Sequence, residues 1–546
     1  MRNSGVRDLI LAGGSGFALG CSGPPMHLGF LAYVSIAPLL VLVSRSPTYR
    51  RALLLSYLFH VFLVLIVAHW LFLGAHWYLR VSAALFVLCY PVLLSLVPLL
   101  WKLVSRTLGD TTAWIAFPFL WVAMEFLQAH TQLTVPFIVL AHSQTYDIAS
   151  LQMASVVGGS GISFVIAGAN VLVMVVIRTL LSGEFRTSSR RLVLPLAGIA
   201  AAVLLPRVYG ATVLHDGPGR SPERRVTVSC VQPAIDPYEK WMGNAEGQIA
   251  RLLSLTNRSA CGGSDLAVWP ETAIPLYILQ PGNDSLFACI RIHMDSLGVP
   301  LLTGFSDWVD YPVGSAPPAS SKFTPSGTHY DLFNAAMLLR PGDAEIPVYR
   351  KIVLMPFFEH VPYNEQLAFL DVNVLRWNFG TGGYRAGTDT TVFRIHCREG
   401  GEARFGTVIC YETEFPWLVA DVVKKGAEFM VVITNDSWWG NSAAPYQHKQ
   451  LAVLRAVESR RWLVRCANGG ISCCIDPYGR VVSATHFGQP GTISFHVPLR
   501  DDITPFVRHG DWVGRGSALG SLLIACIAVA VARRTKPLSP GRTTVP

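Results

Sequence analysis

Charged residues are scarce in this sequence. Only 14% of its 546 residues are Asp, Glu, Lys or Arg, and 51% are hydrophobic, whereas an average soluble protein carries about 25% charged residues. The chain is also too long for one ordinary domain. The shortage of charge therefore predicts a membrane protein. The long apolar runs lie before about residue 210 and near the C-terminus, so the charged stretch between them, over about residues 220–511, is expected to form one soluble domain.

A basic stripe with interleaved aromatic side chains is also absent, although the net charge is +9. Nucleic-acid-binding proteins usually show such a stripe, so no nucleic-acid partner is expected. The basic residues instead lie beside apolar runs, as at Arg45, Arg50 and Arg51. This placement is typical of the topology signals of membrane proteins.

The sequence lacks a CxxC pair and any regular cysteine spacing. Eight of the eleven cysteines fall between Cys230 and Cys474, so disulfides are possible there if this region lies outside the cytoplasm. The same irregular spacing argues against a zinc site, and no metal or other cofactor is expected. The adjacent Cys473 and Cys474 would face opposite sides of a strand.

Long apolar runs are present at eight places. They lie near residues 9–21, 28–43, 53–73, 81–101, 111–127, 162–181, 192–205 and 518–532. Runs of this kind can cross the roughly 30 Å of hydrocarbon in a bilayer. We therefore predict an α-helical transmembrane bundle of about eight spans, with about seven helices in residues 1–210 and a last helix over 516–534.

Lys and Arg are concentrated in every second connection between these runs, and the connection over 129–161 contains neither. By the positive-inside rule, this distribution places both termini in the cytoplasm, including a tail over 535–546, and the 220–511 domain on the other side. Glu125 lies within the fifth run, where a carboxyl faces either a polar cavity or the outer membrane interface.

Short β-branched runs alternate with amphipathic stretches after residue 225. The runs predict strands over 226–231, 266–269, 301–305, 335–339, 408–409 and 429–433, and the stretches predict helices over 244–255, 286–297, 416–425 and 449–459. Alternation of this kind indicates an α/β fold.

Three reactive side chains lie at the ends of apolar runs in this domain. Glu271 follows Leu-Ala-Val-Trp-Pro, Lys351 precedes Ile-Val-Leu-Met, and Cys410 follows Phe-Gly-Thr-Val-Ile. Taken singly, each is more often structural: a turn glutamate, a solvated lysine and a packed thiol. Residues at strand ends can nevertheless converge on one edge of a sheet.

The three residue types complement one another chemically. A thiol acts as a nucleophile only when a base or a cation helps it to lose its proton, and the tetrahedral adduct that follows needs an electrophilic stabiliser. Glu271, Lys351 and Cys410 supply one of each. The pattern therefore favours covalent catalysis by Cys410.

The three segments, in this chain order, resemble the Glu-Lys-Cys triad of the carbon-nitrogen hydrolase (nitrilase) superfamily, over about residues 225–497. With apolar runs on both sides, nearly the whole chain resembles one membrane family within it, the apolipoprotein N-acyltransferases. Further similar segments are Val-Gln-Pro with Lys240-Trp241, Thr-Asn-Asp-Ser-Trp-Trp-Gly around Asn435, and Arg-Ala-Val-Glu followed by Arg465, Asn468 and Ser472.

This resemblance implies a four-layer αββα sandwich for the soluble domain. It also implies that Glu271 accepts the thiol proton, that Lys351 stabilises the oxyanion and that Cys410 holds the acyl group. The remaining site residues that it implies are two supporting carboxylates and three aromatic cavity residues: Glu359, Glu412, Trp241, Tyr411 and Trp438.

The resemblance further implies a monomeric enzyme of the bacterial inner membrane with a periplasmic catalytic domain. Its acyl donor would be a membrane phospholipid and its acceptor a diacylglyceryl-apolipoprotein, acylated on the α-amino group of its N-terminal cysteine in the last step of lipoprotein maturation. One departure from the family is Phe358, which stands where Gly usually precedes the second glutamate. Lipid access near Glu359 is therefore expected to differ.

Two other functions stay open on the sequence. One is a membrane-tethered amidase or nitrilase-type hydrolase that uses the same triad with water as acceptor, and release of free acid from small amides would favour it. The other is a catalytically silent transporter or scaffold that binds lipid or lipoprotein. Reaction of Cys410 with a thiol-directed, lipid-like probe would argue against that second alternative.

Overall fold

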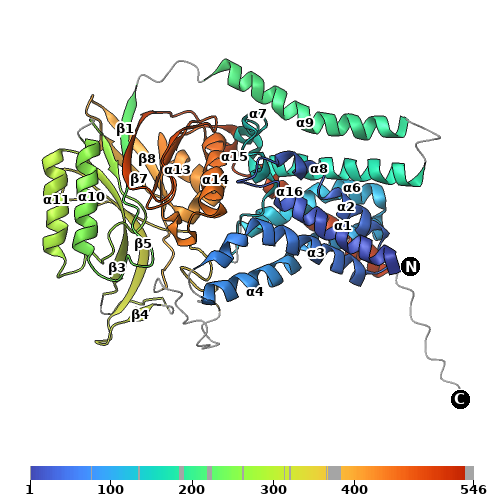
Figure 1. Ribbon diagram of the computed structural model, residues 1–546, viewed down its shortest axis with the longest axis horizontal. Coiled ribbons are helices and arrows are strands. Elements are labelled where there is room, and N and C mark those ends of the chain that lie inside the picture. The colour runs from blue at the N-terminus through green and yellow to red at the C-terminus, as the bar shows by residue number, and fades with distance from the viewer. Residues whose placement is uncertain are drawn as a thin grey trace.

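The computed structural model describes residues 2–74, 77–132, 136–183, 190–217, 224–260, 263–312, 314–318, 321–363, 366 and 383–534. A helical region comes first, a region with two β-sheets follows, and a last helix returns to the first region (Figure 1). The tail predicted over 535–546 lies outside the described residues.

Each predicted apolar run contains a helix. The long helices are α1 (Arg2–Gly20), α2 (Ala37–Arg45), α3 (Tyr49–Val67), α4 (Trp77–Leu94), α5 (Leu96–Leu108), α6 (Asp110–Gln128), α8 (Ala154–Ser182), α9 (Arg190–Asp216) and α16 (Trp512–Arg534). Among the described residues, five helical stretches are long and apolar enough to cross a membrane: Tyr49–Val67, Leu79–Leu108, Ala154–Ser182, Arg191–Asp216 and Trp512–Arg534.

The second predicted run is not one continuous helix. It forms the 3-10 turn η1 (Gly29–Tyr33) and then α2, which has a proline in its first turn. Proline fits the first turn of a helix because it has no backbone N–H to contribute there. At 1.5 Å per residue, α2 alone would cover only about 14 Å, less than a membrane crossing.

The α/β region contains two sheets. The first has the strand order β13-β1-β2-β3-β5-β4, with β6 paired to β5, and the second has the order β12-β11-β10-β9-β8-β7. The strands of the first sheet are β1 (Arg225–Gln232), β2 (Leu266–Val268), β3 (Leu301–Asp310), β4 (Lys322–Phe323), β5 (His329–Leu339), β6 (Val348–Arg350) and β13 (Gly491–Pro498). Those of the second are β7 (Val392–His396), β8 (Glu402–Ile409), β9 (Phe429–Thr434), β10 (Leu463–Ala467), β11 (Cys473–Ile475) and β12 (Val481–Ala484).

The middle strands of each sheet run parallel. β1, β2 and β3 are parallel neighbours in the first sheet, and β8, β9 and β10 in the second. Every residue of β9 is buried, as expected for a parallel strand covered on both faces. Within each sheet the carboxyl ends of the parallel strands lie at one edge. The residues that follow β8 and β9 are therefore neighbours, and packing of the two sheets brings them to the residues that follow β2.

The two sheets pack face to face and are flanked by helices. Val228 of β1 and Phe405 of β8 belong to one buried core between the sheets. Helices α10 (Ala245–Ala260) and α11 (Asp284–Leu297) cover the outer face of the first sheet, and α13 (Pro416–Lys424) and α14 (Ala443–Ser459) cover the second (Figure 1). Cys473 and Cys474 face opposite sides of β11, toward the helices and the other sheet respectively, which confirms the alternation predicted for them.

The α/β region rests on the helical region through α14. Leu454 of α14 and Ile166 of α8 belong to the same buried core. Polar contacts cross the same boundary, because the Gly159 backbone N–H donates to Glu458 Oε1 at 2.8 Å and Gln450 Nε2 donates to the Thr145 carbonyl at 3.2 Å. The helical region therefore forms a floor beneath the second sheet and its helices.

Candidate active site

Glu271, Lys351 and Cys410 line one cavity of about 300 Å³. Glu271 follows β2, Lys351 follows β6, and Cys410 follows β8. Gly304 of β3 lets the Glu271 turn approach the sheet, since a Cβ there would lie 2.6 Å from both the Pro270 carbonyl oxygen and the Thr272 nitrogen. The three predicted triad residues thus meet because each follows a strand that ends beside the cavity, and because Gly304 leaves room for the Glu271 turn.

Cys410 occupies an unusual backbone conformation at the end of β8. Its φ of +53° lies in the left-handed region, which costs a non-glycine residue about 1 kcal/mol or more. Two contacts to its carbonyl oxygen stabilise the turn: Thr413 Oγ1 donates at 2.9 Å, and His448 Nε2 lies at 2.9 Å. The turn begins the 3-10 helix η7 (Cys410–Glu414).

Charge around the thiol acts in both directions. Burial and the Glu271 carboxylate raise the pKa of Cys410 above its usual range, while Lys351 acts to lower it. A thiol with a raised pKa is protonated at neutral pH and is a poor nucleophile until a base removes its proton. The resting site therefore needs a carboxylate beside the thiol, and Glu271 lines the same cavity.

The Lys351 ammonium lies between two carboxylates. Its Nζ is 2.9 Å from Glu359 and 3.5 Å from Glu271 Oε1, and the side chain is only 1% exposed. Burial alone would lower the pKa of Lys351, but Glu359 and Glu271 together raise it above its usual range. The lysine is therefore a fixed positive charge inside the cavity.

Asn334, in the middle of β5, ties the two carboxylates together. Its Nδ2 donates to Glu271 Oε1 at 2.7 Å and to Glu359 Oε1 at 2.8 Å. The backbone N–H of Asn435, after β9, donates to Glu271 Oε2 at 3.0 Å. Both Glu271 oxygens are thus held in place by hydrogen-bond donors.

The two predicted supporting glutamates lie in different places. Glu359 lines the cavity beside Lys351, whereas Glu412 is fully buried and is not part of the cavity wall. Glu412 accepts hydrogen bonds from Tyr349 Oη and the backbone N–H groups of Ile352, Val353 and Ile409, at 2.6 to 3.1 Å. Burial raises the pKa of Glu412 to about 7, although Lys351 and these donors act in the opposite direction. The Glu412 carboxylate therefore links the segment after Lys351 to the end of β8, directly before Cys410.

Replacing Glu412 by alanine should destabilise the protein without removing any group from the cavity wall. Four buried donors would lose their acceptor, and we expect a loss of about 2 to 4 kcal/mol. Denaturant unfolding of the purified variant, followed by fluorescence, measures this loss. Glu399→Ala, which removes an exposed carboxylate of the same domain, is the control. Equal unfolding midpoints for the two variants would contradict a clamping role for Glu412.

Aromatic side chains form much of the rest of the cavity wall. Trp241, Tyr411 and Trp438 line it as expected, and Trp241 is 40% exposed, so it lies at an opening. Phe358 also lines the cavity, and its ring meets Trp439 edge to face at 5.4 Å. The residue that departs from the family pattern is therefore part of the cavity wall.

The helical region contributes wall residues that the sequence reasoning missed. Trp70, Leu79 and Phe137 of the helical region line the cavity, and Trp70 contacts both Phe137 and Trp439 edge to face, at 5.6 and 5.0 Å. Their apolar surroundings in the sequence give no signal that separates them from ordinary bundle residues. The cavity therefore has a floor from the helical region, and the α/β region contributes both the triad and most of the aromatic wall.

A buried ionic network supports the Cys410 turn. Its members Asp436 and His448 were not predicted as site residues from the sequence. Arg465 donates to both oxygens of Asp436 at 2.8 Å, and His448 Nδ1 lies 3.0 Å from Asp436 Oδ1. Burial would raise the pKa of Asp436, but Arg465 and His448 hold it well below its usual range. Because Nε2 of His448 faces the Cys410 carbonyl, that nitrogen carries a proton. The signal for Arg465 and for the segment around Asn435 was present in the matched motifs.

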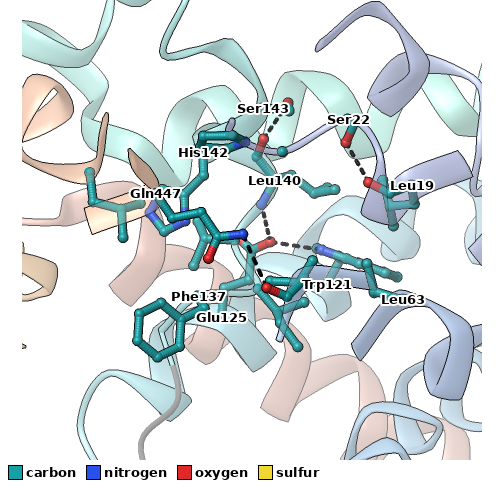
Figure 2. Close-up of a pocket in the computed structure, with 16 residues that line it drawn as sticks. Leu19, Ser22, Leu63, Trp121, Glu125, Phe137, Leu140, His142, Ser143 and Gln447 are labelled. Carbon is teal, nitrogen blue, oxygen red and sulfur yellow. Dashed lines mark hydrogen bonds between the residues drawn. The ribbon is translucent and has the colours of Figure 1, made fainter. Parts of the chain in front are cut away.

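A second, smaller hollow of about 40 Å³ adjoins Phe137 (Figure 2), which also lines the first cavity. Glu125 faces this hollow and is 5% exposed. Its Oε1 accepts from Trp121 Nε1 and from the Leu140 N–H, both at 2.9 Å. Glu125 is therefore a buried residue whose carboxyl faces this hollow.

Comparisons with known proteins match both regions of the chain. The carbon-nitrogen hydrolase family model matches residues 227–502, and the model of the apolipoprotein N-acyltransferase N-terminal domain matches residues 15–172. The chain is 33% identical over 530 residues to the apolipoprotein N-acyltransferase of Chlorobaculum tepidum, covering 95% of this chain and 96% of that protein. It is 30% identical to the protein of the same name from Geobacter metallireducens, covering 96% and 95%.

Among solved structures, an amidase from Nesterenkonia sp. is 17% identical and has a TM-score of 0.36, with 53% of this chain and 94% of that chain covered.

Proposed function

The chain belongs to the apolipoprotein N-acyltransferase family, and from this premise we propose that it works by a two-step exchange through a thioester on Cys410. It is a membrane enzyme of the nitrilase superfamily that acts on lipoproteins. The observation that carries the proposed mechanism is the convergence of Cys410, Glu271 and Lys351 in a buried cavity whose floor comes from the helical region.

In the first step, the Cys410 sulfur attacks an ester carbonyl of a membrane glycerophospholipid. Glu271 accepts the thiol proton, and the Lys351 ammonium stabilises the oxyanion of the tetrahedral adduct. The carbon–oxygen bond then breaks, Glu271 returns the proton to the departing oxygen, and a lysophospholipid leaves. Its fixed hydrogen bonds from Asn334 and Asn435 keep Glu271 oriented for both transfers.

In the second step, the α-amino group of a diacylglyceryl-cysteine at the apolipoprotein N-terminus attacks the thioester carbon. A carbon–nitrogen bond forms, the carbon–sulfur bond breaks, and the Cys410 thiol is regenerated. A thioester suits this order because it reacts readily with amines. Apolar walls that exclude water would suppress hydrolysis of the intermediate, and the aromatic lining around Trp439 supports that role.

The proposed topology follows from the same cavity. Trp70, Leu79 and Phe137 of the helical region form the floor of the site. We therefore place this face of the α/β region at the outer leaflet of the bacterial inner membrane. About eight crossings, both termini in the cytoplasm and a periplasmic αββα domain agree with the distribution of Lys and Arg. A monomer holds all the residues that this mechanism uses.

Phe358 and the neighbouring tryptophans would then contact the acyl chain. Phe358 packs edge to face on Trp439, so it narrows the cavity beside Glu359 relative to a glycine at the same place. We expect this wall to affect which acyl chains are accepted more strongly than it affects the chemistry of the triad.

The mechanism is tested with the wild-type protein in vesicles that contain phospholipid labelled in its acyl chains. We expect a labelled adduct on the peptide that contains Cys410, visible as a mass increase of one acyl group and removed by hydroxylamine. Addition of a diacylglyceryl-cysteinyl peptide should then release the adduct as an N-acylated peptide. Free fatty acid without N-acylated peptide would instead indicate a hydrolase, and bound lipid without any adduct would indicate a binding protein.

A further inference from the structure

Glu414, the last residue of η7, is a carboxylic acid that the mechanism above does not use. Glu414 lies four residues after Cys410, lines the same cavity and is only 4% exposed. Neither of its carboxyl oxygens has a hydrogen-bond partner among the residues that the structure describes. Leaving a buried polar group unpaired costs about 1 to 3 kcal/mol and calls for a specific explanation.

The other carboxylates near the nucleophile are fully occupied. Glu271 and Glu359 share Asn334 and Lys351, and each accepts one further backbone N–H. Glu412 accepts four donors. Glu414 thus stands out within the described part of the cavity, because both of its carboxyl oxygens are buried and neither accepts a hydrogen bond.

The two nearby arginines, Arg455 and Arg465, do not form ion pairs with the Glu414 carboxylate. Arg455 Nε lies 3.2 Å from Glu458 Oε2, and Arg465 donates twice to Asp436 at 2.8 Å. Burial raises the pKa of Glu414 well above its usual range, with Arg455 and Arg465 acting in the opposite direction. Both arginines influence Glu414 electrostatically, but their ion pairs are with Glu458 and Asp436. Arg455 Nη1 has no hydrogen-bond partner among the described residues, and it forms no ion pair with Glu414.

The second step of the exchange needs a group of this kind. An α-amino group is largely protonated below about pH 8, and an ammonium nitrogen has no electron pair with which to attack a thioester. One proton must leave before attack, and a second must leave as the amide forms. Glu271 can take one proton and return it to the sulfur, so the other needs a different acceptor.

We propose that the Glu414 carboxylate binds the α-ammonium group of the lipoprotein acceptor and takes the proton that this group loses before it attacks the thioester. The inference rests on the function proposed above, because it concerns only the second step. One N–H bond of the ammonium breaks as an O–H bond forms on Glu414. The freed electron pair then forms the carbon–nitrogen bond, and a second N–H proton passes through Glu271 to the Cys410 sulfur as the carbon–sulfur bond breaks. Glu414 afterwards releases its proton to water.

The burial of Glu414 suits this transfer. A carboxylic acid with an ordinary pKa near 4 is a weak base toward an α-amino group with a pKa near 8. Burial moves the pKa of Glu414 upward, toward that of the amine, and efficient proton transfer is favoured when the two values are close. The arriving positive charge also stabilises the ionised carboxylate that must accept the proton.

The test separates the two steps with Glu414→Gln, which keeps the size of the side chain. Wild-type and variant proteins are first acylated with labelled phospholipid, and the adduct is then mixed with a diacylglyceryl-cysteinyl peptide. We expect acyl-adduct formation within about threefold of wild type, but transfer to the peptide roughly 10- to 100-fold slower at pH 6.5. Glu399→Gln, which removes an exposed carboxylate, should change neither rate.

The pH profile distinguishes proton removal from a structural role. At pH 9 the peptide amine is already neutral, so transfer by Glu414→Gln should recover to within about threefold of wild type. Hydroxylamine, which is uncharged at neutral pH, should discharge the adducts of the wild type and the variant at equal rates. Transfer to the peptide that is unchanged at pH 6.5, or slowed equally at every pH and for both amines, would overturn the proposal.

Two further results cover the cases in which Glu414→Gln does not fold or the wild type forms no adduct. If Glu414→Gln does not fold, the wild-type profile decides: transfer to the peptide should fall much less than tenfold per pH unit below pH 8, and a full tenfold fall per unit would overturn the role of Glu414. If the wild type forms no adduct on Cys410, the mechanism itself fails. An adduct that discharges normally in Glu414→Gln contradicts only this inference.

Discussion

The Cys410→Ala variant should form no acyl adduct and should transfer acyl groups at least roughly 10⁴-fold more slowly than wild type. Without the sulfur there is no thioester, and a direct attack of the amine on a phospholipid ester would have no covalent intermediate to divide the barrier. The left-handed turn at residue 410 tolerates alanine about as well as cysteine, so the fold should be retained. Transfer from labelled phospholipid to a diacylglyceryl-cysteinyl peptide measures the loss.

Two cysteine variants serve as controls for Cys410→Ala. Cys289→Ala removes an exposed thiol on α11, and Cys466→Ala removes a thiol that is fully buried in β10. Both should retain the adduct and the transfer rate, because neither thiol lines the cavity. A hydroxylamine-sensitive label that persists in Cys410→Ala would place the nucleophile elsewhere and remove the central claim of the mechanism.

The Lys351→Met variant should slow formation of the acyl adduct by roughly 10²- to 10³-fold, the usual effect of removing an oxyanion stabiliser. It should also lower the free energy of unfolding by about 3 to 5 kcal/mol, because it breaks a buried ion pair and leaves two carboxylates together. Lys351 Nζ lies 2.9 Å from Glu359 and 3.5 Å from Glu271. Single-turnover acylation and denaturant unfolding measure the two effects separately.

A double variant separates the catalytic effect of Lys351 from its effect on stability. Lys351→Met with Glu359→Gln removes one positive and one negative charge, so we expect most of the stability to return. The rate of acylation should stay low, because no cation then faces the oxyanion. Recovery of both properties would show that Lys351 serves only to neutralise the carboxylates, and an unaffected rate in Lys351→Met would exclude it from the chemistry.

The positions of Glu271 and Cys410 could be predicted because each follows a run that forms a strand. The Ile-Val-Leu-Met run after Lys351 forms no strand, and Lys351 instead follows β6, which the residue pattern did not predict. Glu271 and Cys410 follow parallel strands in different sheets, and within each sheet the parallel strands direct their carboxyl ends to one edge. Each strand run is local in sequence, so residue type and spacing are sufficient to indicate it. The matched segments added the order of the three residues, which no single motif contains.

Asn334 could not be predicted in the same way. It lies within β5, where Ser306 of β3 is its register partner, and nothing nearby distinguishes it from other polar residues of a strand. Its contacts with Glu271 and Glu359 depend on strand pairing and on the chain after β6, which are set by distant parts of the sequence. The same holds for Trp70, Leu79 and Phe137, which become cavity residues only where the helical region meets the sheets.

The segment Cys-Tyr-Glu-Thr-Glu separates the information that is local in the chain from the information that comes from distant segments. The segment determined that a thiol follows a strand and that two carboxyls follow the thiol within four residues. Folding places Glu412 among four donors in the interior, whereas Glu414 lines the cavity and its buried carboxyl oxygens have no donor among the described residues. The reason is physical: residue order sets which groups are near along the chain, but the partners of a buried charge come from segments that only folding brings within hydrogen-bonding distance.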